Sequence, residues 1–221
     1  MYDIGFFNPR RGVGTSLLAA HLLGYLRDHG IHSYAAVQRG DGMDHLELEE
    51  RWGFAKKLGP RIRLADLEPP RPGPFVSIQD IRSTFPLFGL RSLLCQLSIL
   101  VIRDEESFVR GVAALPNLPG TRLCVWNGAS EQQRARCRLP ASAKRLARFA
   151  TTAIPHCAAL ERAHETATLV WHLPGGSESP GGRAMTRLMR EILRNTALDL
   201  DLDLLQQARV PHAVAAEGVA Q

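Results

Sequence analysis

The sequence predicts an α/β fold class, with a mostly parallel central sheet flanked by helices on both faces. Two observations predict it. Short apolar runs, typical of buried strands, alternate with segments whose apolar residues recur at helical spacing, and most of the connections between them are short. The length also fits, because 221 residues with 45% hydrophobic and 22% charged side chains suffice for one globular core.

The amino-terminal half is expected to open with a strand, a turn and a helix. An apolar run predicts the strand at residues 4–7, and a turn rich in Pro, Arg and Gly follows it. Apolar residues then recur every three or four positions until Gly30, which predicts a helix over residues 16–29. The patterns that follow predict a strand at 31–37, a short helix at 45–54, a surface loop at 68–74 and a strand at 75–78.

The carboxyl-terminal half is expected to continue the alternation. The patterns predict, in order, a helix at 87–97, a strand at 99–102, a helix at 105–114, a strand at 122–126, a basic helical stretch at 132–149 and an extended segment at 151–154. The segment 174–182 has the composition of a flexible surface turn. We expect one domain over residues 1–195, followed by an acidic, leucine-rich extension over 196–221 that is partly flexible.

Composition narrows the classes of function. The longest apolar stretch, residues 93–102, is about half as long as a membrane span, and residues 1–12 lack the pattern of a secretory signal. A cytoplasmic protein without membrane insertion is therefore expected. The four scattered cysteines predict reduced, mostly buried thiols, and the eight histidines show no metal-ligand spacing. The net charge of +5 permits an anionic partner.

The turn after the first strand has the composition of a phosphate-binding loop. Its sequence is Asn8-Pro9-Arg10-Arg11-Gly12-Val13-Gly14-Thr15-Ser16. A glycine-rich turn between a strand and a helix aims backbone N–H groups and the positive end of the helix dipole at a phosphate, and a hydroxyl in the first helical turn ligates Mg²⁺. An ordinary turn that happens to contain two glycines is the alternative interpretation.

This turn resembles the deviant Walker A loop of the ParA/MinD family, whose pattern is K-G-G-x-G-K-S/T-S/T. Arg10 falls on the signature lysine, Gly12 and Gly14 on family glycines, and Ser16 on the magnesium-binding hydroxyl. The resemblance implies a P-loop NTPase-like fold and a homodimer in which Arg10 reaches the partner's phosphate. It also implies a site for ATP or ADP with Mg²⁺, to which the loop contributes Arg11, Gly12, Val13, Gly14, Thr15, Ser16 and Leu17.

Weaker motifs extend the resemblance over most of the chain. Residues 97–112 resemble the family's strand and the helix after it, and Trp126-Asn127 resembles the strand end where family members place an asparagine near the base. Residues 152–163 resemble the segment that helps to form the adenine pocket. The resemblance therefore implies nucleotide contacts by Asn127 and Pro155.

One departure from the family pattern removes a charge from the loop. Thr15 replaces the phosphate-binding lysine. A charge-assisted contact to phosphate contributes about 1.5–3 kcal/mol, so a neutral residue would weaken nucleotide binding by roughly ten- to a hundredfold without compensation. Arg11, which stands where the family has a glycine, either supplies the missing charge or fills the space that the phosphate needs.

The acidic positions depart from the pattern as well. The family's second strand ends in a D-x-D-type motif that positions water and magnesium, and here only Asp41 survives, displaced by one place. The Walker B aspartate corresponds to Gln79 or Asp80. The resemblance thus implies catalytic roles for Arg10, Asp41 and Asp80, and Mg²⁺ binding by Ser16 and Asp80. With these groups depleted, we expect a pseudo-ATPase or a very slow ATPase.

The implied function is to position or assemble a larger bacterial machine through a protein partner. A threonine in place of the Walker lysine resembles the BcsQ-type members, which are associated with bacterial cellulose secretion. Two rival functions stay open. One is an active partition ATPase that binds nucleoid DNA, and the other is a nucleotide-free scaffold in which the loop is a relic.

A basic segment before residue 151 carries the DNA hypothesis. Its six cations are Arg134, Arg136, Arg138, Lys144, Arg145 and Arg148. Surface arginines in ParA-like dimers bind DNA without sequence preference, and Arg145 and Arg148 are the DNA contacts we predict; a solvated helix face is the alternative. The acidic stretch 198–205 argues against MinD-like docking on a membrane, because anionic lipid would repel it.

Overall fold

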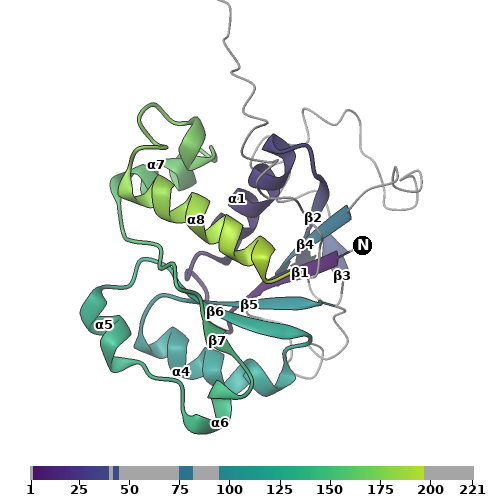
Figure 1. Cartoon of the computed structure of the whole chain (residues 1–221), viewed down its shortest axis with the longest axis vertical. Coiled ribbons are helices and arrows are strands. Elements are labelled where there is room, and N and C mark those ends of the chain that lie inside the picture. Colours follow the sequence, from purple (N-terminus) through teal and green to yellow (C-terminus); the bar gives the residue numbers. More distant parts are fainter. Residues whose placement is uncertain (1, 40–41, 45–74, 82–94, 197–221) are drawn as a thin grey trace, which may run out of the picture.

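The computed structural model describes residues 2–39, 42–44, 75–81 and 95–196 of the chain (Figure 1). Several sequence predictions fall outside these residues. They are the helix at 45–54, the loop at 68–74, most of the helix at 87–97, Asp41, and the carboxyl-terminal extension beyond Thr196, including the acidic stretch 198–205.

A seven-stranded sheet forms the centre of the described structure, in the order β3-β2-β4-β1-β5-β6-β7. The strands are β1 (Tyr2–Phe7), β2 (His32–Arg39), β3 (Gly42–Asp44), β4 (Phe75–Ile81), β5 (Leu97–Ile102), β6 (Thr121–Trp126) and β7 (Arg148–Phe149). All neighbouring strands run parallel except β2 and β3, which are antiparallel. The predicted mostly parallel sheet is confirmed. Strand β1 lies between β4 and β5 and runs parallel to both. The turn after β1 therefore lies at the edge of the sheet where these parallel strands have their carboxyl ends.

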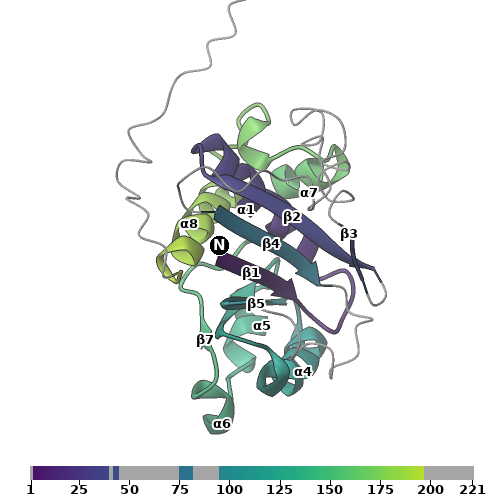
Figure 2. The same ribbon diagram turned by 90° about the vertical axis from the view of Figure 1, so that its right-hand side faces the viewer.

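Helices cover both faces of this sheet (Figures 1 and 2). One face carries α1 (Thr15–Asp28), α7 (Ala158–Glu165) and α8 (Pro180–Arg194), together with the 3₁₀ turn η4 (Val170–His172). The other face carries α4 (Glu105–Ala114), the 3₁₀ turn η3 (Leu115–Asn117), and the segment with the short helices α5 (Glu131–Arg136) and α6 (Ala141–Lys144).

The side chains of the central strands alternate between two cores. In β5, Ile99 and Val101 pack with α1 and α8, whereas Leu100 and Ile102 pack with α4. This alternation follows from the two-residue period of a strand, and a strand buried on both faces appears as a continuous apolar run. Residues 17–26 of α1 are all buried, so this helix is held firmly between the sheet and its neighbours.

The helix predicted over residues 132–149 is wrong. Pro140 stands in its middle, and α5 ends at Arg136 while α6 starts only after the proline. A proline inside a helix removes a backbone donor and clashes with the preceding turn, which divides the stretch. Its last residues form β7 instead. The predicted helix over 87–97 also ends wrongly, because Leu97 is the first residue of β5. The antiparallel edge strand β3 was not predicted.

The segment 174–182 agrees in part with the surface turn that its composition predicted, since residues 174–178 form a mostly exposed turn. Its last residues form the first turn of α8, where Ser179 caps the helix by accepting a hydrogen bond from the Gly182 amide at 3.0 Å. Gly181 and Gly182 are buried, and a Cβ atom on Gly182 would overlap the carbonyl oxygen of Gly176. These glycines permit close packing, which composition cannot distinguish from flexibility.

The cysteines agree with prediction, since Cys95, Cys124 and Cys137 are buried, Cys157 is half-buried and all four are free thiols. In the part of the chain that the structure describes, no helix combines the length and the apolar character that crossing a bilayer requires.

Candidate functional site

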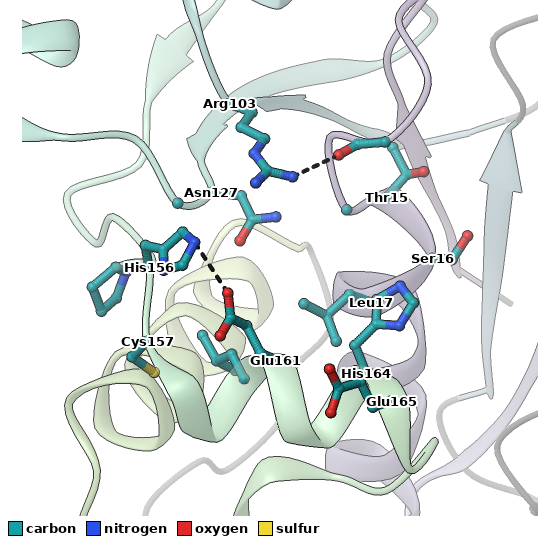
Figure 3. A pocket seen from close by; sticks show the side chains of 15 residues that line it. Thr15, Ser16, Leu17, Arg103, Asn127, His156, Cys157, Glu161, His164 and Glu165 are labelled. Atoms are coloured by element: carbon teal, nitrogen blue, oxygen red, sulfur yellow. Dashed lines mark hydrogen bonds and ion pairs between the residues drawn. The ribbon is translucent and has the colours of Figure 1, made fainter.

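A pocket of about 450 Å³ opens at the carboxyl edge of the sheet, between the turn after β1 and helix α7 (Figure 3). One side is lined by the loop and the first turn of α1, with Gly12, Gly14, Thr15, Ser16 and Leu17. The ends of β5 and β6 contribute Arg103, Asn127 and Gly128. Ligand sites of open parallel sheets lie at this edge, beyond the carboxyl ends of the strands.

The loop depends on two glycines with left-handed backbone conformations. Gly12 has φ 76° and Gly14 has φ 95°, values in a backbone region that residues other than glycine rarely adopt. A Cβ atom on Gly14 would also overlap the side-chain nitrogen of Asn127, whereas one on Gly12 would meet no atom within 4 Å. Gly14 is therefore required both by conformation and by space.

Two side chains from the neighbouring strands fix the loop. Asn127 Nδ2 donates to the carbonyl oxygen of Val13 at 2.7 Å, and Arg103 Nη1 donates to that of Gly12 at 3.1 Å. The backbone of the loop is thus anchored to the ends of β5 and β6. Asn127 was expected near a base, and in this structure it lies against the loop while also lining the pocket.

Helix α1 presents its amino terminus to the pocket. Gly14 is the N-cap residue and supplies no side-chain cap, and the first turn contains no acidic residue. The first backbone N–H groups of a helix have no partner within the helix, and the helix dipole places partial positive charge there. Together these features favour an anion such as phosphate.

A hydroxyl and a buried carboxylate meet beside the loop. Ser16 Oγ donates a hydrogen bond to Asp80 Oδ2, and Asp80 is only 2% exposed. The contact arises because β4 pairs with β1, with Asp80 opposite Phe6. The other Walker B candidate, Gln79, instead accepts a hydrogen bond from the Cys95 thiol at 3.3 Å. Of the two, the structure brings Asp80 to the predicted magnesium ligand Ser16.

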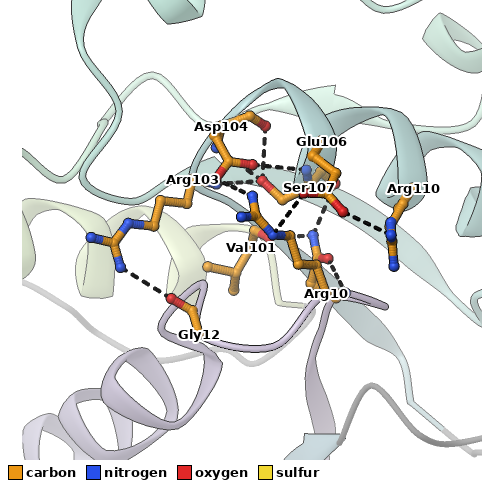
Figure 4. Close-up of polar contacts among 9 residues, drawn as sticks. Arg10, Gly12, Val101, Arg103, Asp104, Glu106, Ser107 and Arg110 are labelled. Carbon is orange, nitrogen blue, oxygen red and sulfur yellow. Dashed lines mark hydrogen bonds and ion pairs between the residues drawn. The ribbon is translucent and has the colours of Figure 1, made fainter.

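Arg10 lies outside the pocket, against the start of α4 (Figure 4). Its guanidinium forms an ion pair with Asp104 and another with Glu106 at 3.3 Å. Asp104 caps α4 by accepting from the Ser107 amide at 2.9 Å. Burial tends to raise the pKa of Asp104, but the Ser107 amide and the Arg10 guanidinium outweigh it and hold that pKa below its ordinary value.

The remaining predicted loop residues divide between pocket, surface and core. Thr15 and Leu17 line the pocket, as does Pro155 on the opposite wall. Arg11 is exposed and does not line the pocket, and Val13 is buried in the hydrophobic core.

The wall opposite the loop is formed by residues 155–157 and the inner face of α7. His156 Nε2 lies 3.2 Å from Glu161 Oε1, and Glu161 and Glu165 bring two carboxylates to this side. Glu191 of α8 holds the approach to this wall by accepting from the backbone amides of Thr151 at 2.6 Å and Thr152 at 3.0 Å. Burial tends to raise the pKa of Glu191, but these hydrogen bonds lower it overall.

Sequence reasoning missed Arg103. It directly follows β5, the strand next to β1, and its guanidinium extends over the loop and into the pocket (Figure 3). Its position at the carboxyl end of a predicted central strand was the signal that could have found it.

The predicted DNA contacts lie away from the pocket. Arg145 and Arg148 are exposed, as are Arg136, Arg138 and Lys144, and none of them lines the pocket. Arg134 is half-buried.

The groups at the loop fit a magnesium-bound phosphate. Hydroxyl and carboxylate oxygens are ligands that Mg²⁺ prefers, and the Ser16–Asp80 pair supplies one of each beside the helix amino terminus. The glycine turn before the helix is also compatible with loops in which successive backbone N–H groups bind an anion.

A central parallel strand, a glycine turn and a helix that starts with a hydroxyl-bearing residue define a P-loop NTPase-like fold. The fold is similar to that of MinD. A chain of the MinC:MinD cell division protein complex from Aquifex aeolicus matches with a TM-score of 0.60 and 11% sequence identity, covering 90% of this chain and 98% of that chain. No protein-family model matches the sequence, and no curated protein sequence does. The predicted fold class is confirmed.

Proposed function

We propose that this chain is a ParA/MinD-like positioning or assembly factor for a bacterial machine, which binds ATP or ADP with Mg²⁺ weakly and hydrolyses ATP little or not at all. The observation that carries the proposal is the hydrogen bond between Ser16 and Asp80 beside the glycine loop. This contact joins a first-turn hydroxyl and a buried carboxylate beside the glycine loop, and both are oxygen ligands of the kind that Mg²⁺ prefers.

The pocket and the Ser16–Asp80 pair beside the loop each have a role in this proposal. The amino terminus of α1 and the loop would hold the phosphates, and Ser16 and Asp80 would hold Mg²⁺, which neutralises phosphate charge when bound. The apolar surface of Pro155 and Leu160 on the opposite wall would contact the base. A pocket with an apolar wall and a few convergent polar groups suits a ligand of this size.

Two features support weak hydrolysis. Thr15 brings no charge to the phosphates. Arg10, the counterpart of the signature lysine, is engaged by Asp104 and Glu106 of its own chain, so it would have to leave both carboxylates to reach a partner's phosphate. Phosphoryl transfer depends on charge neutralisation and positioning, and both are reduced here.

The partners are part of the same proposal. A solved structure with a similar fold is a complex of MinD with MinC, which supports a protein partner for this chain as well. We infer a homodimer that positions its machine, and the Thr15 replacement makes the cellulose secretion apparatus one candidate machine. A nucleotide-free scaffold is the outcome if the pocket takes no nucleotide.

Calorimetric titration with Mg-ATP tests the proposal. We expect weak binding by the wild-type protein and binding that is roughly ten- to a hundredfold tighter for Thr15→Lys, because the lysine restores a charge-assisted contact. Thr121→Lys is the matched control, since it adds the same charge at the exposed start of β6, at the opposite edge of the sheet. Tight binding by the wild type would contradict the weakening argument. Absence of binding by the wild type would favour the scaffold.

DNA binding is a second candidate function, favoured by the five exposed cations of the basic segment. We expect the double change of Arg145→Glu and Arg148→Glu to weaken binding to a labelled duplex and to lower the salt dependence of log K by about two. The matched control is the double change of Arg187→Glu and Arg194→Glu, which alters the net charge equally on exposed positions of α8. Equal effects of both double variants in fluorescence anisotropy would indicate an unspecific charge effect and reject a site in the basic segment.

A further inference from the structure

We propose that Arg103 is the phosphate-binding cation of the pocket and supplies part of the charge that the lysine replaced by Thr15 would have brought. The inference rests on the proposed nucleotide site and assigns a residue that the loop pattern does not contain. Its ligand is the phosphate chain of a nucleoside diphosphate or triphosphate.

The position of Arg103 supports the assignment. Its guanidinium lies over the loop, where Nη1 donates to the carbonyl oxygen of Gly12 at 3.1 Å (Figure 4). The base of the side chain is fixed, because the Arg103 amide donates to Ser107 Oγ at 2.9 Å within the capping structure of α4. Because the Arg103 backbone is fixed and the end of its side chain is exposed, the guanidinium can turn toward a ligand while the backbone stays in place.

The other nearby cations are elsewhere. Arg10 is held by two carboxylates on the α4 side, and Arg11 is exposed; neither lines the pocket. Among the described residues that line the pocket, Arg103 alone is an arginine or lysine. It is therefore the permanent positive charge that the described pocket offers to a phosphate.

The charges across the pocket give a bound nucleotide a direction. Arg103 and the amino terminus of α1 make one side electropositive, while Glu161 and Glu165 of α7 face the opening from the other side (Figure 3). Phosphates would be repelled by the carboxylates and attracted to the loop side. This polarity places the phosphate chain next to Arg103.

The chemistry of the guanidinium suits the task. Arginine has five N–H donors in a planar fork that matches phosphate oxygens, and among the described residues the Arg103 guanidinium donates one hydrogen bond, to Gly12. The remaining donors would bind phosphate oxygens while Nη1 keeps its contact with the loop. One side chain would thus both hold the loop and neutralise the ligand.

Calorimetry with adenosine, AMP, ADP and ATP in the presence of Mg²⁺ tests the assignment in the full-length protein. For Arg103→Gln we expect affinity for ADP and ATP to fall about ten- to a hundredfold, with a loss that grows with the number of phosphates and is absent for adenosine. Arg103→Lys should recover part of the affinity. Arg162→Gln is the matched control, because Arg162 is an exposed α7 residue that does not line the pocket.

The outcomes separate this inference from the proposed function. If the wild type binds ADP and Arg103→Gln binds it equally well, the assignment of Arg103 is overturned and the nucleotide site stands. An equal loss for adenosine and ATP would overturn it too, since that result indicates a role only in holding the loop. If Arg11→Gln shows the phosphate-dependent loss instead, Arg11 is the cation. If the wild type binds no nucleotide, both proposals fail. Thermal unfolding of each variant verifies that it is folded.

Discussion

Replacing Gly14 with alanine is expected to abolish measurable nucleotide binding and to lower the free energy of unfolding by about 2–3 kcal/mol. Gly14 has φ 95°, where a non-glycine residue is strained by about 1–2 kcal/mol. The new methyl group would also overlap Asn127 Nδ2, which would displace the hydrogen bond from Asn127 to Val13. Losing that hydrogen bond adds about 1 kcal/mol, and the loop would no longer keep its shape beside the pocket.

A matched variant separates strain from collision. Gly175 has φ 67°, and a Cβ atom there would meet no atom within 4 Å, so Gly175→Ala carries the backbone strain alone. We expect it to cost about 1–2 kcal/mol in urea denaturation and to leave nucleotide binding unchanged. Combining Gly14→Ala with Asn127→Ala should recover part of the loss, because it removes the collision. Identical unfolding free energies for Gly14→Ala and Gly175→Ala would contradict the loop geometry described above.

The buried His21 should make the protein lose about 3 kcal/mol of folding stability between neutral pH and pH 4. This residue lies in the middle of α1 and is fully buried. Its Nδ1 lies 2.8 Å from the Leu17 carbonyl oxygen and its Nε2 lies 3.0 Å from the Val170 amide nitrogen. Because the carbonyl only accepts and the amide only donates, the ring is neutral, with its proton on Nδ1.

The direction of the pH effect follows from the pKa of His21. Burial lowers that pKa from 6.5 to about 4, against an opposing effect of the Leu17 hydrogen bond. Below pH 6.5 the unfolded chain therefore takes up a proton that the folded protein does not bind until about pH 4. The contribution of the neutral ring to stability is complete above pH 6.5 and is lost progressively as the pH falls to about 4.

Urea denaturation between pH 4 and pH 8 measures this effect when the wild type is compared with His21→Gln. Glutamine is uncharged throughout and still offers an acceptor for the Val170 amide. We expect the difference in unfolding free energy between the two proteins to shrink by about 3 kcal/mol from neutral pH to pH 4. His32→Gln removes a histidine from an exposed position and serves as the control. Parallel stability curves for wild type and His21→Gln would refute the role of His21.

Local patterns were enough to predict several elements. The helix predicted at 105–114 coincides with α4, because its apolar spacing and the Asp104 cap are both encoded within a few neighbouring residues. The helix predicted over 132–149 does not form, because Pro140 divides this polar stretch. Gly181 and Gly182 were predicted to belong to a flexible turn, but they are buried in α8. Glycine is suited both to flexible turns and to close packing, so composition did not distinguish the two.

The part of the candidate site formed by contiguous loop residues was predictable from the sequence. The part formed by residues from different strands was not. The glycines, Ser16 and the following helix are contiguous, so their order already indicated a phosphate-binding turn. The choice between Gln79 and Asp80 stayed open in the sequence, because a shift of one residue along a strand reverses which side chain faces the site. Pairing of β4 with β1 is what places Asp80 at Ser16.

The amino-acid sequence by itself determined the mostly parallel α/β class and the position of the glycine loop. Both follow from properties of neighbouring residues, namely periodicity, the placement of glycines and the order of strands and helices. The tertiary structure alone decided that Arg10 pairs with α4, that Arg103 reaches the pocket and that Asp80 meets Ser16. The contacts of Arg10, Arg103 and Ser16 join residues 64 or more positions apart. Such contacts form only when the parallel strands bring their carboxyl ends to one edge of the sheet.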